Sequence, residues 1–355
     1  MVLLAQELRK RGHEISVIAF YDGVHKQVLL ESGVTVHTLK RGRWDVLGFL
    51  WRLVKIVRNQ SPDVLYGYLA TCNLLVSFLR PFTPNTKAVW GVRTANLKFQ
   101  YYDWLSRTLN FIEMKLSGLA SLVIVNSQAG RRHLMTEGIP DKKIVVILNG
   151  IDGNRFYPDR SAREKTRAKW KIASDEILIG IVGRIDPIKE HGVFLTAASK
   201  LCQIYPKARF ICVGESVNQY YQQSLYELIK DLKLQQSAIW TGAQYDMLGV
   251  YNALDILTNT SSSEGFSNVI GEAMSCGVPC VVTDVGDSAL IIGKTGVVVP
   301  ANDVSALLEG WIKCLQQNRQ EAAHSARQRI AEHFSIQELV EQTEATLMRF
   351  CREHS

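Results

Sequence analysis

Residues 177–189 read ILIGIVGRIDPIK: six apolar residues, a glycine, and then an arginine and a lysine five positions apart. An apolar run of this length, rich in β-branched residues, is typical of a strand buried on both faces. Such strands belong mainly to parallel sheets, whose ligands bind beyond the carboxyl ends of the strands. The run therefore predicts an α/β domain with a basic loop, Gly183 to Lys189, at its ligand edge.

The rest of the chain repeats this alternation of strand and helix. Between the apolar runs lie segments with helical spacing, such as 46–57. We therefore expect an α/β protein with two Rossmann-like, doubly wound parallel-sheet domains that face each other across a cleft. The predicted strands are 15–20, 34–39, 64–68, 88–92, 122–126 and 144–148 in the first half, and 177–182, 209–213, 239–241, 256–260, 279–283 and 296–299 in the second.

The segment from Asn149 to Asp175 is the only long one without a predicted strand. It contains the turn-forming run Asn149-Gly150-Ile151-Asp152-Gly153, a proline and a charged stretch, 159–171, so we place the hinge there. The predicted domains are residues 1–155 and 156–335. The last segment, 336–355, has helical spacing, and we consider that it packs back on the first domain.

Composition agrees with two ordinary globular domains: of 355 residues, 46% are hydrophobic and 21% are charged. No apolar run approaches the roughly 18 residues that span a bilayer, and charges come too early for a secretion signal. The seven cysteines lie mostly in apolar patterns, which favours a reducing, cytoplasmic compartment. Cys276 and Cys280 lack a second pair at zinc-site spacing, so no metal site is expected.

The net charge of +7 is unevenly distributed. Residues 1–155 hold 21 Lys and Arg against 11 Asp and Glu, whereas the remainder holds 20 against 23. A basic first half suits an anionic partner, either a membrane surface or a phosphorylated lipid substrate, or is a merely soluble basic surface. A nucleic acid is not expected, because no aromatic-basic motif or zinc finger accompanies the charge.

The loop after the predicted strand 256–260 is the most informative part of the chain. It reads SSSEGFSNVIGEAM over residues 261–274, with Glu264 and Glu272 separated by seven residues. Gly265 exposes backbone N–H groups, and a helix that begins near Ser267 offers the partial positive charge that suits a phosphate. Carboxylates accept hydrogen bonds from sugar or ribose hydroxyls. The alternative is that Glu264 is a helix-terminus charge and Glu272 a solvated helix residue.

The two loops complement each other chemically. The guanidinium of Arg184 and the ammonium of Lys189 can neutralise a diphosphate, and if both loops belong to one sheet they reach the same ligand. In isolation, each cation could equally be a solvated surface charge.

With these residues in view, the chain resembles family 4 of the retaining glycosyltransferases, which have the GT-B fold. The resemblance rests on Gly183 to Lys189 and on the glutamate pair in its Gly-Phe context, and it covers nearly the whole chain. Further similarities are Arg11-Gly12-His13-Glu14, Asn149-Gly150-Ile151-Asp152 and the run 272–279, EAMSCGVP.

The resemblance implies a metal-independent, retaining, hexosyltransferase-type enzyme. It would take a UDP- or GDP-sugar as co-substrate, without a cofactor, and the second domain would hold this donor. The acceptor, a saccharide or lipid-linked precursor of cell-envelope polysaccharide, lipopolysaccharide or glycolipid, would sit on the first domain. The basic first half of the chain, rather than the resemblance, motivates the further prediction of a cytoplasmic enzyme that rests peripherally on the inner face of the membrane.

The resemblance also implies roles for matching residues. Arg184 and Lys189 would bind the diphosphate and assist its departure, because fixed cations stabilise the charge that develops there. Glu264 would hold the transferred sugar beside Gly265, Phe266 and Ser267, and Glu272 would grip the ribose. The predicted substrate-binding residues are Gly183, Gly265, Phe266, Ser267, Asn268, Glu272 and Arg93, and the predicted catalytic residues are Arg184, Lys189 and Glu264.

Two features depart from the family pattern. The family usually begins with a strand and a glycine-rich turn, whereas this chain begins at the following helix, so we expect the first domain to lack its first strand. We hypothesise that Met1 is an internal methionine of the natural protein. Many relatives also carry a histidine after the fourth strand, where this chain reads Arg93-Thr94-Ala95-Asn96. Arg93 is the candidate for contacting the donor or the acceptor there. The alternative is that Arg93 is simply a solvated cation.

Other functions remain open at this point. An epimerase or phosphorylase shares the architecture, although a phosphorylase would bring a pyridoxal lysine in a much longer chain. A degenerate protein could hold a sugar nucleotide without transferring the sugar. A dinucleotide oxidoreductase is weaker, because no G-x-G-x-x-G follows a predicted strand. Turnover of any donor would separate the enzyme from the binding protein.

Overall fold

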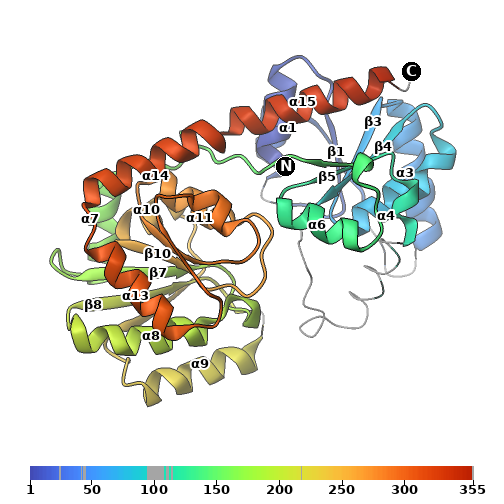
Figure 1. Cartoon of the computed structure of the whole chain (residues 1–355). Coiled ribbons are helices and arrows are strands. Elements are labelled where there is room, and N and C mark those ends of the chain that lie inside the picture. Colours follow the sequence, from blue (N-terminus) through green and yellow to red (C-terminus); the bar gives the residue numbers. More distant parts are fainter. Residues whose placement is uncertain are drawn as a thin grey trace.

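The structure is a computed structural model that describes residues 1–23, 25–40, 42, 45–93, 108, 112, 115–216 and 218–353. Two α/β domains lie side by side, and the C-terminal helices α14 (Arg319–His333) and α15 (Ile336–Glu353) run from one domain to the other (Figure 1). Each of the twelve predicted strands is present, with ends shifted by at most two residues. The prediction of two Rossmann-like parallel-sheet domains is therefore confirmed.

The C-terminal domain contains a six-stranded parallel sheet in the order β12-β11-β10-β7-β8-β9. The strand order reverses between β7 and β10, which are direct neighbours, and this reversal is where doubly wound sheets bind ligands. The strands are β7 (Ile177–Val182), β8 (Ala208–Val213), β9 (Ala238–Gly242), β10 (Ile256–Asn259), β11 (Cys280–Thr283) and β12 (Val297–Val299).

Helices cover both faces of this sheet, and a separate apolar core lies on each face. In one of these cores, Phe194 packs edge to face on both Phe210 and Trp311, and the three ring centroids lie 5.5–5.9 Å apart. The helices are α7 (Arg160–Lys169), α8 (His191–Ile204), α9 (Gln219–Asp231), α10 (Met247–Ala253), α11 (Asn268–Ser275), α12 (Ser288–Ile292), α13 (Val304–Leu315) and α14 (Arg319–His333), with the 3₁₀ turn η5 (Pro187–Lys189).

The N-terminal domain has two parallel sheets. One contains β1 (Ser16–Ala19) and β2 (Thr35–Thr38), and the other has the order β3 (Val64–Tyr68), β4 (Lys87–Val92), β5 (Leu122–Val125), β6 (Ile144–Val146). Within the described ranges, no strand pairs β1 with β3. The other elements are α1 (Val2–Lys10), α2 (Lys26–Glu31), α3 (Val46–Gln60), α4 (Ala70–Leu79), α6 (Gln128–Thr136), and the 3₁₀ turns η1 (Arg80–Phe82), η3 (Ser117–Leu119) and η4 (Asp141–Lys143).

Two crossings connect the domains. The linker after β6 passes against the turn between α14 and α15, where Ile151 N–H donates to the Phe334 carbonyl at 2.7 Å. A Cβ at Gly150 would lie 2.7 Å from the Ser335 carbonyl, so glycine is required at this close approach. Helix α15 (Ile336–Glu353) then packs on the N-terminal domain, where Glu344 accepts from Arg11 at 2.7 Å.

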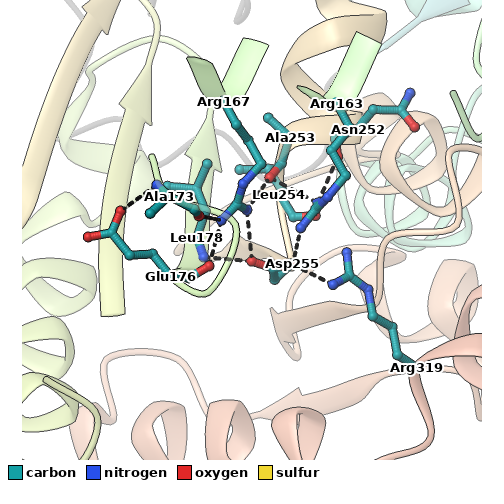
Figure 2. Close-up of polar contacts among 10 residues, drawn as sticks. All are labelled: Arg163, Arg167, Ala173, Glu176, Leu178, Asn252, Ala253, Leu254, Asp255 and Arg319. Atoms are coloured by element: carbon teal, nitrogen blue, oxygen red, sulfur yellow. Dashed lines mark hydrogen bonds and ion pairs between the residues drawn. The ribbon is translucent and has the colours of Figure 1, made fainter. Parts of the chain in front are cut away.

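The charged stretch 159–171 forms helix α7, and three arginines converge there on the carboxylate of Asp255 (Figure 2). Asp255 contacts Arg163 at 2.7 Å, Arg167 at 3.1 Å and Arg319 at 2.8 Å, and it accepts the N–H of Leu178 at 2.7 Å. Asp255 precedes β10 and Leu178 lies at the start of β7. The cluster therefore fixes α7 to the amino edge of the sheet, opposite the ligand edge.

Candidate functional site

The loops after β7 and β10 are joined by hydrogen bonds at the carboxyl edge of the sheet. Ser262 N–H donates to the Ile188 carbonyl at 2.8 Å, and the hydroxyl of Thr260 donates to the Lys189 carbonyl at 2.6 Å. Because β7 and β10 are neighbours, the two loops predicted to cooperate begin from adjacent strand ends. The backbone of each loop thus positions the other.

The first loop depends on glycines. Gly183 has φ +147°, in the region that L side chains rarely adopt, and it turns the chain away from β7. The neighbouring Gly214 also has φ +147°, and a Cβ there would lie 1.9 Å from the Gly183 carbonyl oxygen. Asp186 then caps the short turn η5 by accepting the Ile188 N–H at 3.0 Å. This geometry places Lys189 at the end of the turn.

Lys189 and Glu264 form an ion pair at the centre of the site. Both side chains are mostly buried, with 21% and 14% of their surface exposed. The same Glu264 oxygen accepts the hydroxyl of Ser261 at 2.7 Å. Two predicted site residues from different loops are therefore in direct contact, and a substrate hydroxyl or phosphate would meet a pre-assembled ammonium and carboxylate.

Arg184 has a different environment. Its side chain is 69% exposed, and its closest acidic neighbour is Asp186 at 3.9 Å, which is a loose contact. The guanidinium is therefore free of strong competing hydrogen bonds among the described contacts and is accessible to an anion. Arg184 and Lys189 leave the same loop, but only Lys189 is held in place.

The start of helix α11 is organised by Asn259. Its side-chain amide donates to the Ser267 hydroxyl at 3.0 Å, and its oxygen accepts the Ser261 N–H at 3.0 Å. The helix begins after Ser267, as the sequence predicts. Phe266 is buried, with its ring 5.7 Å from that of Phe334, so only its backbone can meet a ligand. Gly265 lies close to the N-terminal domain, because a Cβ there would be 3.5 Å from the carbonyl oxygen of Arg93.

Glu272 lies inside the protein rather than on a solvated helix face. The hydroxyl of Tyr251, from α10, donates to its carboxylate at 2.5 Å. Burial raises the pKa of Glu272, although the Tyr251 hydrogen bond and the charge of Arg155 oppose this. Tyr251 is 0% exposed, and burial next to this carboxylate raises its own pKa well above the usual value. The sequence did not identify Tyr251, because no pattern links it to Glu272.

The N-terminal domain contributes Arg93, which follows β4. Its guanidinium donates to Asn149 at 2.7 Å and lies 4.6 Å above the ring of Tyr68. Asn149 in turn donates to Asn268 at 2.8 Å, at the first position of α11. A hydrogen-bonded path therefore runs from Arg93 through the linker to the glutamate loop. The three residues after Arg93 in the predicted loop, 94–96, lie outside the described residues.

Asp287 was also missed by the sequence analysis. It follows β11 at the same edge, and its carboxylate accepts the N–H groups of Gln128 at 2.7 Å and of Ala129 at 3.0 Å. Those groups begin helix α6 of the other domain. The position of this acidic residue in a loop after a predicted strand is a signal in the sequence. Its partners, Gln128 and Ala129 of the other domain, have no such signal.

The described residues include neither a candidate metal cluster nor a candidate membrane-spanning helix. They contain no group of three or more His, Cys, Asp or Glu side chains arranged to hold a metal ion. None of their helices is both long enough and apolar enough to span a bilayer.

Comparison with protein families places a match on each domain. Residues 1–155 match the family described as Glycosyltransferase Family 4, and residues 176–317 match the family described as Glycosyl transferases group 1. The second match contains both loops of the site.

The curated relatives that the chain matches are also glycosyltransferases. A GDP-mannose-dependent alpha-mannosyltransferase of Mycobacterium tuberculosis is 26% identical over 93% of this chain and 86% of its own length. The capsular polysaccharide biosynthesis glycosyltransferase CapM of Staphylococcus aureus is 22% identical over 98% of this chain and 92% of its own. A lipopolysaccharide core mannosyltransferase of Rhizobium meliloti, LpsB, is 30% identical, but the match covers 54% of this chain and 57% of LpsB.

Solved structures agree on the fold. HepE of Anabaena, in complex with UDP-glucose, superposes with a TM-score of 0.86 at 23% identity and covers 98% of this chain and 94% of its own. The lipopolysaccharide outer core galactosyltransferase WaaB superposes with a TM-score of 0.71 at 15% identity, covering 98% of this chain and 93% of its own.

Proposed function

We propose, on the premise that this chain is a two-domain glycosyltransferase of the GT-B fold, that it transfers a sugar from a nucleotide-diphosphate donor with retention of anomeric configuration. The ion pair between Lys189 and Glu264 carries the proposal. In this pair, a cation that can bind the leaving diphosphate lies next to a carboxylate that can bind the sugar hydroxyls. The pair lies at the switch of strand order, where the fold binds ligands.

In the proposed reaction, the bond between the anomeric carbon and the donor phosphate oxygen breaks, and the nucleoside diphosphate leaves. Lys189 and Arg184 stabilise the negative charge that grows on this leaving group. Glu264 moves from Lys189 to the hydroxyls of the sugar when the donor phosphates take over the ammonium. The acceptor hydroxyl attacks the same face and gives its proton to the departing phosphate oxygen, so no metal ion or cofactor is needed.

Glu272 is proposed to accept hydrogen bonds from the ribose hydroxyls, with its carboxylate oriented by Tyr251. The N–H groups of the turn at Gly265 to Ser267, together with the start of α11, face the donor. Arg93 is proposed to contact donor or acceptor from the N-terminal domain. The relatives act in mannosyl transfer, capsular polysaccharide and lipopolysaccharide synthesis, so we propose a saccharide or lipid-linked acceptor of the cell envelope.

The testing experiment measures release of nucleoside diphosphate from a panel that includes UDP-glucose and GDP-mannose, with and without EDTA. We expect one donor to be turned over, at least by slow hydrolysis, and EDTA to have no effect. The same donor at a hundred times its dissociation constant should stabilise the protein by about 2.7 kcal/mol. Stabilisation without any turnover would show a binding protein. The absence of both stabilisation and turnover would refute the sugar-nucleotide site.

We further propose that helix α3 rests on an anionic membrane surface during the reaction. Leu47 and Trp51 are 83% and 64% exposed on this helix, and Lys55 lies 5.3 Å from the Trp51 ring. Exposed aromatic and apolar side chains beside cations suit the interface of an anionic lipid layer.

Flotation with vesicles of phosphatidylglycerol and phosphatidylcholine tests this surface. Leu47→Glu combined with Trp51→Glu should abolish flotation with the anionic vesicles. Tyr245→Glu is the matched control, because Tyr245 is 96% exposed on the other domain. Flotation that ignores the anionic lipid content, or that survives the double substitution, would contradict the proposal.

A further inference from the structure

Asp287 connects the two domains at a buried point. Its carboxylate oxygens accept the N–H groups of Gln128 and Ala129, at 2.7 and 3.0 Å, which are the first two residues of helix α6. Only 3% of Asp287 is exposed, and Ser127, which begins this helix, is 0% exposed. A carboxylate of the C-terminal domain thus supplies the hydrogen bonds that a helix of the N-terminal domain lacks at its start.

The same residue is joined to the glutamate loop. The backbone N–H of Asp287 donates to the Gly265 carbonyl at 3.0 Å, directly after Glu264. A Cβ at Gly286 would lie 2.4 Å from the Glu264 carbonyl oxygen, so the two loops are in close contact. The Gly265 position also approaches the N-terminal domain, because a Cβ there would lie 3.4 Å from the Ser127 hydroxyl.

The two ends of Asp287 therefore act on different parts of the site. Its side chain can bind α6 only when the domains are together, and its backbone holds the loop that carries Glu264. When the domains separate, water replaces the α6 contacts and the loop loses its support from the other domain. Separation of the domains would therefore break the α6 contacts of Asp287, directly beside the loop that carries Glu264.

We propose that Asp287 is a positioning residue that couples domain closure to the placement of the Glu264 loop for transfer. This proposal rests on the proposed function, since it assigns the consequence of closure to the sugar-transfer step. The residues proposed to bind the diphosphate and the ribose, Lys189 and Glu272, belong to the C-terminal domain, and α6 contributes none of them. Loss of the Asp287 contact should consequently lower kcat and leave the affinity for the donor nearly unchanged.

Two substitutions test the contact from its two sides. Asp287→Asn keeps the shape but turns an NH₂ group toward one of the α6 N–H donors. Gln128→Pro removes the N–H that lies 2.7 Å from Asp287. Proline is tolerated at the first position of a helix. The preceding Ser127 has φ −157° and ψ 150°, an extended conformation that suits a residue before proline.

Asp303→Asn is the matched control. Asp303 accepts the N–H groups of Ser305 and Ala306 at 2.9 Å each at the start of α13, within one domain. It therefore reproduces the loss of a helix-capping carboxylate without touching the contact between domains.

The measurements are small-angle scattering with UDP-glucose and with GDP-mannose, the dissociation constant of each by calorimetry, and kcat. We expect Asp287→Asn and Gln128→Pro each to increase the radius of gyration and to lower kcat roughly 10–100-fold, with the dissociation constant changed less than about threefold. The combined loss in the double variant should be smaller than the sum of the two single losses, because both substitutions weaken the same interaction between Asp287 and the start of α6. Asp303→Asn should lower only the melting temperature.

A radius of gyration and a kcat in Asp287→Asn that equal those of the wild type would overturn the proposal. An increase in the radius of gyration of Asp303→Asn as large as that of Asp287→Asn would also overturn it. An additive loss in the double variant would do the same. Scattering needs no turnover, so a wild-type protein that transfers no sugar would refute the proposed function while the domain contact is still measured.

Discussion

Substitution of Asp255 by asparagine separates the stability of the C-terminal domain from its chemistry. This carboxylate is 11% exposed and is the shared acceptor of Arg163, Arg167 and Arg319 (Figure 2). Asparagine can still accept the Leu178 N–H, but it cannot balance the guanidinium charges. Arg167 matters most, because its side chain is only 6% exposed. Its charge would remain buried without a counter-ion, although three hydrogen bonds to backbone carbonyls persist.

The magnitude follows from burial. Removing one partner of a buried ion pair typically costs about 3–5 kcal/mol. Arg319 adds little to this, because its side chain is 59% exposed and the pair is screened by solvent. We therefore expect about 3 kcal/mol for Asp255→Asn. For a domain of this size, that loss lowers the melting temperature by roughly 6–12 °C.

The pH dependence has a defined sign. Burial alone would raise the pKa of Asp255, but the charges of Arg163 and Arg319 and the Leu178 N–H outweigh it and bring the pKa below its usual value. A carboxyl whose pKa is lowered in the folded state contributes stability above its unfolded pKa, near 4, and loses it as the pH falls through the folded value. The difference between wild type and variant should be full at pH 7 and shrink below about pH 4.

Differential scanning calorimetry at several pH values is the assay, with Asp175→Asn as the matched control. Asp175 pairs with Lys207 in the same domain, but both side chains are more than half exposed, so its loss should leave the melting temperature nearly unchanged. Initial rates below the melting temperature should remain at wild-type values in both variants, because the cluster lies at the amino edge of the sheet. Equal melting temperatures for the two variants, or a raised KM for donor in Asp255→Asn, would refute this reasoning.

Three further predictions concern the site itself. Lys189→Gln should lower kcat about 10²–10³-fold in initial-rate assays, whereas Lys207→Gln, which removes an exposed cation, should not. Glu272→Gln should weaken donor binding in calorimetry. It should also raise the melting temperature at pH 7.5, because burial raises the pKa of the Glu272 carboxyl and its ionisation therefore disfavours the folded state. This gain in melting temperature should vanish at pH values below about 4, where the carboxyl is protonated in the folded and the unfolded protein. Tyr251→Phe should weaken donor binding roughly tenfold, and the loss should shrink with donors that lack ribose hydroxyls. Equal losses with deoxyribose donors would count against that role of Tyr251.

Local sequence patterns predicted the fold because each strand carries its own signal. The run 177–182 is apolar throughout since both faces of β7 are covered, and the strand is where the pattern puts it. The convergence of the two loops followed from the same information, because both leave one edge of one sheet, but the ion pair of Lys189 with Glu264 did not. The charged stretch 159–171 was read as part of a hinge, yet it forms α7. Its arginines are held by Asp255, about 90 residues away, and no local pattern reveals that partner.

The contact of Asp287 with α6 shows where such reasoning ends. Asp287 and Gln128 are 159 residues apart, on different sheets, and they meet only through the relative placement of the two domains. That placement is set by the linker crossing at Gly150 and by the return of α15 to the first domain. A loop after a strand can be predicted to face a ligand, but whether it faces the other domain depends on this geometry. The residues that define a site within one sheet are thus readable from its strand ends, whereas those that couple two domains emerge only from their assembly.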